Sequence, residues 1–171
     1  MKIQEVNELI LWSSQFSSLP WRQKRSLYHT LVSEIMLQQT TVPTVLPRFL
    51  PFIKLFPSIK TLALASEEQV LIAWKGLGYY RRARNLQRAA HAIANNHGGE
   101  IPVDIEQLKR ISGIGEYTAH AIAAIGADAP YLCVDSNLER VLSRYYALNE
   151  IKGNPLKKEI HQKIEKKELK I

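Results

Sequence analysis

The 171-residue sequence contains a single cysteine, Cys133, which excludes an internal disulfide and any metal cluster held by several thiolates of this chain. Its longest strongly apolar stretches are too short to span a bilayer. Residues 3–16 include Glu5 and Glu8 and lack a basic stretch followed by an apolar run, so they do not match a secretory signal or a transit peptide. We therefore expect a cytoplasmic protein without a membrane partner.

Hydrophobic residues make up 46% and charged residues 23% of the chain, close to the globular average, which excludes a disordered tail. A chain of this length can form one compact domain or two small lobes. The formal net charge is +7, and residues 152–171 contribute +4 of it. This excess of positive charge indicates a polyanionic partner.

Residues 69–99 contain Lys75 and four arginines but neither Asp nor Glu. Such a stretch is compatible with a solvated helix face and with contact to nucleic acid, and charge alone leaves both interpretations open. The five histidines stand alone, without the spacing of metal ligands. The sequence therefore predicts no metal site.

The hydrophobic periodicity is helical nearly throughout, without an alternating strand pattern, and predicts an all-α fold. Apolar residues at 27, 31 and 35 predict a helix over about 26–41, closed by Pro43. Prolines at 43, 47, 51 and 57 predict short helices with tight joints. Ser66 and Gln69 match a capping box that begins a helix ending near Trp74. We assign Trp21 and Trp74 to the core.

Further helices are predicted over 82–95, 104–110, 137–146 and 155–168, with a glycine-rich turn at 76–80. Residues 111–115 join two helices as a hairpin that contains Gly113 and Gly115. Two residues without Cβ allow close backbone approach, and the free amides of the following helix can bind a phosphate. Most glycine turns of this kind are purely structural, so the hairpin alone leaves both roles open.

Two carboxylates are candidates for acid–base chemistry. Glu34 shares a helix face with Leu27 and Leu31, where a partly desolvated carboxyl could hold a proton near neutral pH. An amphipathic Glu whose head reaches water is the simpler interpretation. Asp135 precedes a helix, where it would serve as an N-cap. Alternatively, Asp135 stays ionised and stabilises a cation, as in the carboxylate pairs of glycoside hydrolysis.

Tyr79 and Tyr80 lie in the glycine turn and are followed at once by Arg81 and Arg82. The two rings could insert against bases while the guanidinium groups hold phosphates. Packing of at least one of the tyrosines in the core is the alternative.

Together these segments resemble the adenine DNA glycosylase (MutY) family of the helix-hairpin-helix DNA glycosylases. The resemblance extends over about residues 19–164 and is most specific in Met-Leu-Gln-Gln-Thr at 36–40 and Gly-Leu-Gly-Tyr-Tyr at 76–80. It implies the all-α HhH-GPD fold within a single domain, residues 1–171. In that fold residues 25–130 would form a helical barrel, and an N-terminal helix with residues 131–171 would belong to a second, incomplete lobe.

The resemblance implies an enzyme of base excision repair that flips adenine out of a mismatch with 8-oxoguanine or guanine and hydrolyses its N-glycosidic bond. Glu34 matches the acid that protonates adenine, Asp135 matches the carboxylate that stabilises the oxocarbenium ion, and Asn137 would lie beside the active site. Tyr117 replaces the lysine with which endonuclease III forms a Schiff base, so a monofunctional glycosylase is expected. The implied contacts to double-stranded DNA are Gln38, Gln39, Gly78, Tyr79, Tyr80, Arg81, Arg82, Arg84, Gly113, Gly115 and Thr118.

The sequence departs from the family pattern in three places. Family members continue to a four-cysteine iron–sulfur motif, whereas this chain has only Cys133, so we expect no cofactor from it and a C-terminally truncated family member. Ser112 and Ser136 replace the usual Pro and Gly. Two alternatives stay open: a DNA-binding remnant without catalysis, and an endonuclease III-like glycosylase for oxidised pyrimidines, which Tyr117 disfavours. We expect a monomer that acts on a bacterial chromosome.

Overall fold

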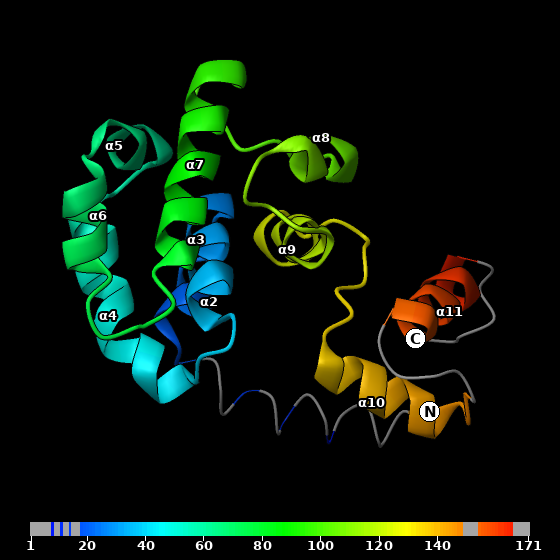
Figure 1. Cartoon of the computed structure of the whole chain (residues 1–171). Helices are drawn as coiled ribbons and strands as arrows, with labels where there is room; N and C mark the ends of the chain where they lie inside the picture. The colour runs from blue at the N-terminus through cyan, green and yellow to red at the C-terminus, as the bar shows by residue number, and fades with distance from the viewer. Residues whose placement is uncertain (1–7, 9–10, 12–13, 15–17, 149–153, 166–171) are drawn as a thin grey trace. The chain divides into compact units, whose positions relative to one another are not determined.

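The computed structural model describes residues 8, 11, 14, 18–148 and 154–165. Secondary structure in these residues is helical, without a strand, as the sequence predicts. The chain divides into two compact units, residues 1–131 and 132–171 (Figure 1). Among the described residues, no helix is both long and apolar enough to cross a membrane.

The first unit is built around one helix, α3 (Leu27–Leu37), which contacts α2 (Pro20–Gln23), α4 (Val42–Leu55), α7 (Arg81–Asn96), α9 (Glu116–Ala121) and the π-helical η1 (Ile122–Gly126). The long helix α7 also packs against α5 (Ile59–Leu64) and α6 (Glu67–Ala73) (Figure 1). Helix α8 (Ile105–Arg110) contacts α9. Helix α3 is therefore enclosed on several sides, and its buried residues include Leu31, Ile35 and Met36.

Aromatic side chains fill the core of the first unit. Trp74 is fully buried and lies edge-on to Phe52, with ring centroids 5.8 Å apart. Trp21 is buried and makes the same kind of contact with Phe49 at 5.3 Å. Burying an apolar side chain of this size stabilises the fold by about 1.5–3 kcal/mol. Both tryptophans thus lie in the core, as predicted.

Side-chain caps begin several of the helices, and one of these caps was predicted from the sequence. The Ser66 hydroxyl accepts from the Gln69 amide at 3.1 Å, and the Ser66 amide donates to Gln69 Oε1 at 2.9 Å. This reciprocal pair satisfies two amides that the first turn of α6 leaves free, and it confirms the predicted capping box. A second box, Ser58 with Thr61, begins α5.

The prediction of short, jointed helices between residues 43 and 57 is wrong, because α4 continues through Pro47 and Pro51. Pro43, Pro47 and Pro51 lie four residues apart and are all exposed. The carbonyls that lose their helix partners therefore fall on one side of α4, where water can replace the missing N–H groups. The opposite side holds the helix in place through its buried residues, Val45, Phe49 and Phe52.

The second unit contains α10 (Ser136–Tyr145) and α11 (Asn154–Glu165), joined by a small core. The buried hydrophobic residues of this core are Val134, Leu142, Leu156 and Ile160. The predicted helix over 137–146 is confirmed to within a residue, and that over 155–168 is confirmed as far as 165, its end lying outside the described residues. Most of the expected N-terminal helix also lies outside them, so its assignment to the second lobe stays a prediction.

Candidate functional site

Apart from the arginines of α7, the predicted binding residues of the first unit lie on three short segments that are linked to one another. These are the end of α3 at Gln38 and Gln39, the turn at residues 76–80, and the hairpin between α8 and α9. Gln38 Nε2 donates to the hydroxyl of Thr118 in α9 at 3.4 Å, and Thr118 is buried. The side chain of Gln38 therefore connects the end of α3 to the second helix of the hairpin, and Gln39 beside it is exposed.

Helix α3 ends four residues earlier than its periodicity predicts. The chain leaves the helix at Gln38, and Gln39 adopts a left-handed conformation with φ +52°. A non-glycine residue in this region is strained, which frequently marks a functional position. Residues 38–39 carry no turn signal, because Gln is not among the residues that favour positive φ.

The glycine turn places two aromatic rings at the surface. The rings of Tyr79 and Tyr80 are 64% and 41% exposed, so the alternative that one of them packs in the core is excluded. The turn is fixed from inside by Trp74, whose indole Nε1 donates to the Gly78 carbonyl at 3.1 Å. Gly76, Gly78 and Tyr79 all have positive φ, which explains why the turn needs two glycines. Exposed aromatic rings on a fixed turn are suited to stacking on bases.

Arg82 does not lie where the sequence interpretation placed it. It was expected to hold a phosphate beside Arg81, but only 6% of its surface is exposed. Its guanidinium donates to backbone carbonyls inside the protein, among them those of Met36 at 2.6 Å and Leu77 at 2.8 Å. Burial lowers the pKa of this guanidinium, while the Tyr79 side chain opposes the shift. Helical spacing was the missed signal, because Arg82 precedes buried Leu86 by four residues.

The other arginines of α7 are exposed, as expected for a basic helix face. Arg81 and Arg84 both reach the surface, and Arg84 Nε pairs with Glu67 Oε1 at 2.7 Å. An exposed pair of this kind is weak, so it can exchange for another anion. Arg84 thus remains available to a phosphate, as does Arg88 one turn further along α7.

The hairpin glycines differ in their surroundings. Gly113 has φ +97°, and a Cβ at this position would lie 2.4 Å from the Asn85 carbonyl oxygen, so the hairpin packs directly on the backbone of α7. Gly115 has open space around it and begins α9. Gly113 therefore serves packing, whereas Gly115 leaves the first amides of α9 accessible.

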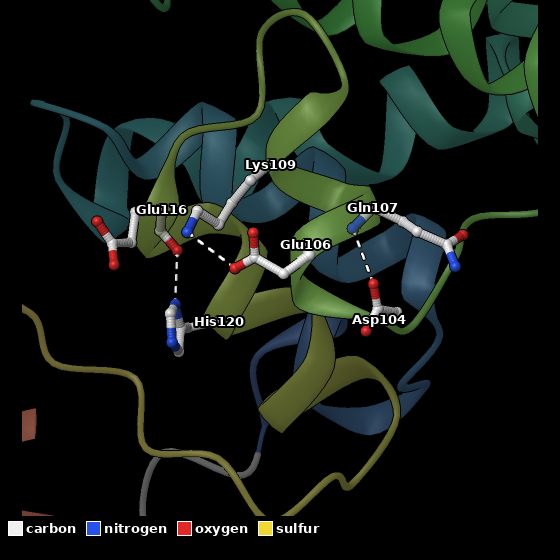
Figure 2. Close-up of polar contacts among 6 residues, drawn as sticks. All are labelled: Asp104, Glu106, Gln107, Lys109, Glu116 and His120. Carbon is white, nitrogen blue, oxygen red and sulfur yellow. Dashed lines mark hydrogen bonds and ion pairs between the residues drawn. The ribbon is translucent and has the colours of Figure 1, made fainter.

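Polar contacts on both sides of the hairpin fix its two helices (Figure 2). Asp104 caps α8 by accepting from the Gln107 amide at 2.9 Å, and Lys109 donates to Glu106 at 3.0 Å. The Glu106 hydrogen bond raises the pKa of Lys109, which lies in the last turn of α8 before the hairpin. In α9, the His120 ring contacts the Glu116 carbonyl oxygen at 2.9 Å.

Two candidate catalytic side chains belong to the first unit. Glu34 lies on α3, one turn before Gln38, and is half-buried. Tyr117 lies in the first turn of α9 and is also half-buried. Because α3 and α9 are in contact, the two helices that carry these residues are neighbours in the first unit.

The second candidate carboxylate belongs to the second unit. Asp135 Oδ1 accepts from the amides of Asn137 at 3.1 Å and Leu138 at 2.7 Å, which confirms its role as the N-cap of α10. Asp135 Oδ2 accepts from Asn137 Nδ2 at 3.2 Å, and Arg140 donates to Asn137 Oδ1 at 3.0 Å. Both oxygens of the carboxylate are thus held in place, and Asn137 links Asp135 to a nearby cation.

No group of three His, Cys, Asp and Glu side chains that could hold a metal ion occurs in the described part of the chain.

The sequence profile described as HhH-GPD superfamily base excision DNA repair protein matches residues 32–168. An adenine DNA glycosylase of Buchnera aphidicola subsp. Baizongia pistaciae (strain Bp) is 41% identical over 143 residues, covering 82% of this chain and 41% of that protein. The adenine DNA glycosylase of Homo sapiens is 40% identical over 150 residues, covering 82% and 28%. The chain therefore spans less than half the length of either relative.

Two solved structures share the fold. A thermostable thymine-DNA glycosylase is 26% identical with a TM-score of 0.74, covering 82% of this chain and 68% of that one. A non-covalent endonuclease III–DNA complex is 21% identical with a TM-score of 0.71, covering 92% and 74%. Together with the relatives, they confirm the resemblance and the fold that the motifs predict.

Proposed function

Because this chain belongs to the HhH-GPD superfamily of base excision DNA repair proteins, we propose that it is a DNA glycosylase that removes adenine from a mismatch in double-stranded DNA. The observation that carries the proposal is the identity of about 40% to proteins named adenine DNA glycosylase. The family profile also includes every candidate site residue, from Glu34 to Asn137.

The proposed DNA contacts come from three segments of the first unit and from the exposed arginines of α7. Tyr79 and Tyr80 are exposed rings that can enter the base stack, and a mismatched adenine is easier to extrude than a paired one. Gln39 is exposed beside them, and Gly115 leaves amides of α9 open to a phosphate. Arg81 and Arg84 supply positive charge along α7.

The proposed reaction is hydrolysis of the bond between C1′ of the sugar and N9 of adenine. Glu34 donates a proton to the adenine ring, and the electron pair of the breaking bond leaves with the neutral base. The sugar becomes an oxocarbenium ion, which the ionised Asp135 stabilises. Water then adds to C1′ and loses a proton, so the products are free adenine and an abasic site.

The proposed enzyme does not cut the DNA strand through an imine. Tyr117 stands where endonuclease III has its Schiff-base lysine, and a phenol cannot form an imine with the sugar. The expected product is therefore an intact abasic strand, which breaks only on treatment with alkali.

A panel of duplexes tests this function. The wild-type chain is mixed in excess with duplexes that carry adenine opposite 8-oxoguanine, guanine or thymine, and one that carries an oxidised pyrimidine. We expect alkali-dependent breaks at adenine opposite 8-oxoguanine or guanine and an intact adenine–thymine duplex. Breaks without alkali at the oxidised pyrimidine would instead support an endonuclease III-like enzyme. Tight binding to the mismatch without release of adenine would show a DNA-binding protein that lacks catalysis.

A further inference from the structure

The guanidinium of Arg82 connects two backbone segments that lie far apart in the sequence. Nη1 donates to the carbonyls of Met36 and Gln38 at 2.6 Å each and to that of Ile35 at 3.2 Å. Nη2 donates to the carbonyls of Leu77 at 2.8 Å and Gly78 at 3.3 Å. One side of the fork therefore holds the end of α3, and the other holds the glycine turn.

The chemistry of these contacts requires an arginine. Hydrogen bonds from a charged donor are stronger than neutral ones, and the last carbonyls of a helix carry partial negative charge that favours a cation. The rings of Trp74 and Tyr79 lie 5.7 Å and 5.6 Å from the guanidinium carbon, within the range of cation–π contacts. A lysine offers one compact ammonium and cannot reach both sets of carbonyls with a planar fork.

Each of the two connected segments contains a strained residue that needs support from its surroundings. Gln39 and Tyr79 both adopt positive φ without being glycine, and such strained conformations persist only when their surroundings hold them. The Gln38 side chain also contacts Thr118 beyond the hairpin, so this residue joins all three segments. Release of the Arg82 contacts would therefore free the two loops that carry Gln39 and Tyr79.

We propose that Arg82 is a positioning residue that fixes the loop of Gln38 and Gln39 against the turn of Tyr79 and Tyr80, so that both loops present one preformed surface to DNA. The role rests on the proposed function in one respect, because DNA is taken as the ligand of that surface. Arg82 itself is buried and acts through the loops rather than on the substrate. Because misplacement by about 1 Å can cost about 100-fold in rate, loss of this fixation should reach the chemical step.

Arg82→Lys tests the proposal, with Gln87→Leu as the matched control. Gln87 lies on the same helix, is buried to a similar degree and donates to the Ala65 carbonyl at 2.7 Å, but it holds neither loop. Both variants lose buried hydrogen bonding and should show lower melting temperatures. The variants are then compared by hydrogen–deuterium exchange of the free protein and by single-turnover adenine release at saturating protein.

We expect Arg82→Lys to speed amide exchange in residues 38–41 and 76–80, leaving the α5–α6 region unchanged. The rate constant of adenine release at saturation should fall at least tenfold, and Gln87→Leu should leave it within about twofold of wild type. Unchanged exchange in both loops, or equal rate losses in the two variants, would overturn the proposal, because either result would make Arg82 an ordinary structural residue.

The proposal can also be tested if Arg82→Lys does not fold or if the wild type is inactive. If Arg82→Lys does not fold, the wild type is measured by native-state exchange at the Thr40 and Leu77 amides, which are hydrogen-bonded to Leu37 and Trp74. Equal opening free energies at the two amides support the proposal that Arg82 fixes both loops together, and clearly different values refute it. If the wild type releases no adenine, the proposed function fails, and the exchange results alone decide whether Arg82 fixes the loops.

Discussion

At the scale of single residues, Asp135 combines a structural and a proposed catalytic role in one carboxylate. One oxygen caps α10 through two backbone amides, and the other accepts from the side chain of Asn137. The cap requires only an oxygen acceptor, whereas stabilising an oxocarbenium ion requires negative charge. A substitution that keeps the acceptor and removes the charge can therefore separate the two roles.

Asp135→Asn is predicted to change the free energy of unfolding by less than about 1 kcal/mol, since Asn caps helices about as well as Asp. Adenine release should fall by about 100-fold or more, because the cation loses its stabilising charge. Thermal unfolding and single-turnover kinetics measure the two effects. Asp104→Asn is the matched control, because Asp104 caps α8 in the same way and should retain full activity. Full activity in Asp135→Asn would remove this residue from the mechanism.

Roles that depend on sequence neighbours could be predicted, whereas roles that depend on distant contacts could not. The caps at Ser66 and Asp135 depend on neighbours within three residues, so the sequence is sufficient to predict them. The role of Arg82 depends on carbonyls more than 40 residues away, which no local pattern contains. The exposure of Tyr79 and Tyr80 was likewise left open, since it depends on how the turn is held.

At the scale of elements, alanine substitutions at the two hairpin glycines can separate packing from DNA binding. Gly113→Ala is predicted to destabilise the fold by about 2 kcal/mol or more, because the new Cβ meets the Asn85 carbonyl and the backbone has positive φ. Gly115→Ala should cost less than about 1 kcal/mol, since its Cβ has open space. It should nevertheless weaken duplex binding several-fold by obstructing the approach of a phosphate.

Chemical denaturation and a fluorescence-anisotropy titration with labelled duplex measure the two quantities for both variants. If Gly115→Ala binds DNA as tightly as wild type, the first turn of α9 does not contact the backbone. If Gly113→Ala is as stable as wild type, the hairpin does not pack on α7 as closely as the structure shows.

Helix α4 allows a prediction in the stabilising direction. Proline within a helix costs about 3 kcal/mol, part of which is offset by its restriction of the unfolded chain. Pro47→Ala restores an amide that can donate to the Pro43 carbonyl, so we expect stabilisation by about 2 kcal/mol. The melting temperature measures this gain, with exposed Leu46→Ala as a control that restores no hydrogen bond. A Pro47→Ala variant that melts no higher than wild type would contradict the account of α4.

Element types were easier to predict than element ends. The periodicity located α7, α8 and α10 to within about a residue, because each buries one regular face. The predicted α3 extended four residues too far, because the last carbonyls of the helix bind Arg82 instead of further amides of the helix. The predicted break at the prolines of α4 does not occur, because the buried side of that helix holds it in place. In both cases tertiary contacts override local propensity.

At the scale of the whole molecule, the two units differ in the size of their cores. Among the described residues, the second unit buries four hydrophobic side chains, while the first has an extensive core that includes Trp74, Phe49 and Phe52. Local opening is easier where few apolar contacts are lost. We therefore expect amides of α10 and α11 to exchange faster than those of α3 and α7 in native-state hydrogen exchange. Equal protection in the two units would contradict this prediction.

The units also divide the proposed chemistry, since Glu34 belongs to the first and Asp135 to the second. The motifs predicted the family, which the profile match confirms. They also predicted the two carboxylates as site residues, which stays a prediction. The roles of the two residues remain proposals, because they concern a substrate that the sequence alone does not position.

The measurement that tests the central claim most directly is single-turnover release of adenine from a duplex with adenine opposite 8-oxoguanine, compared between wild type and Glu34→Gln. Glu34→Gln keeps the size and polarity of the side chain but cannot donate a carboxylic proton. We predict wild-type duplex affinity within about threefold and at least a 100-fold slower release of adenine. Release at the wild-type rate by Glu34→Gln would show that Glu34 is not the acid and would contradict the proposed mechanism.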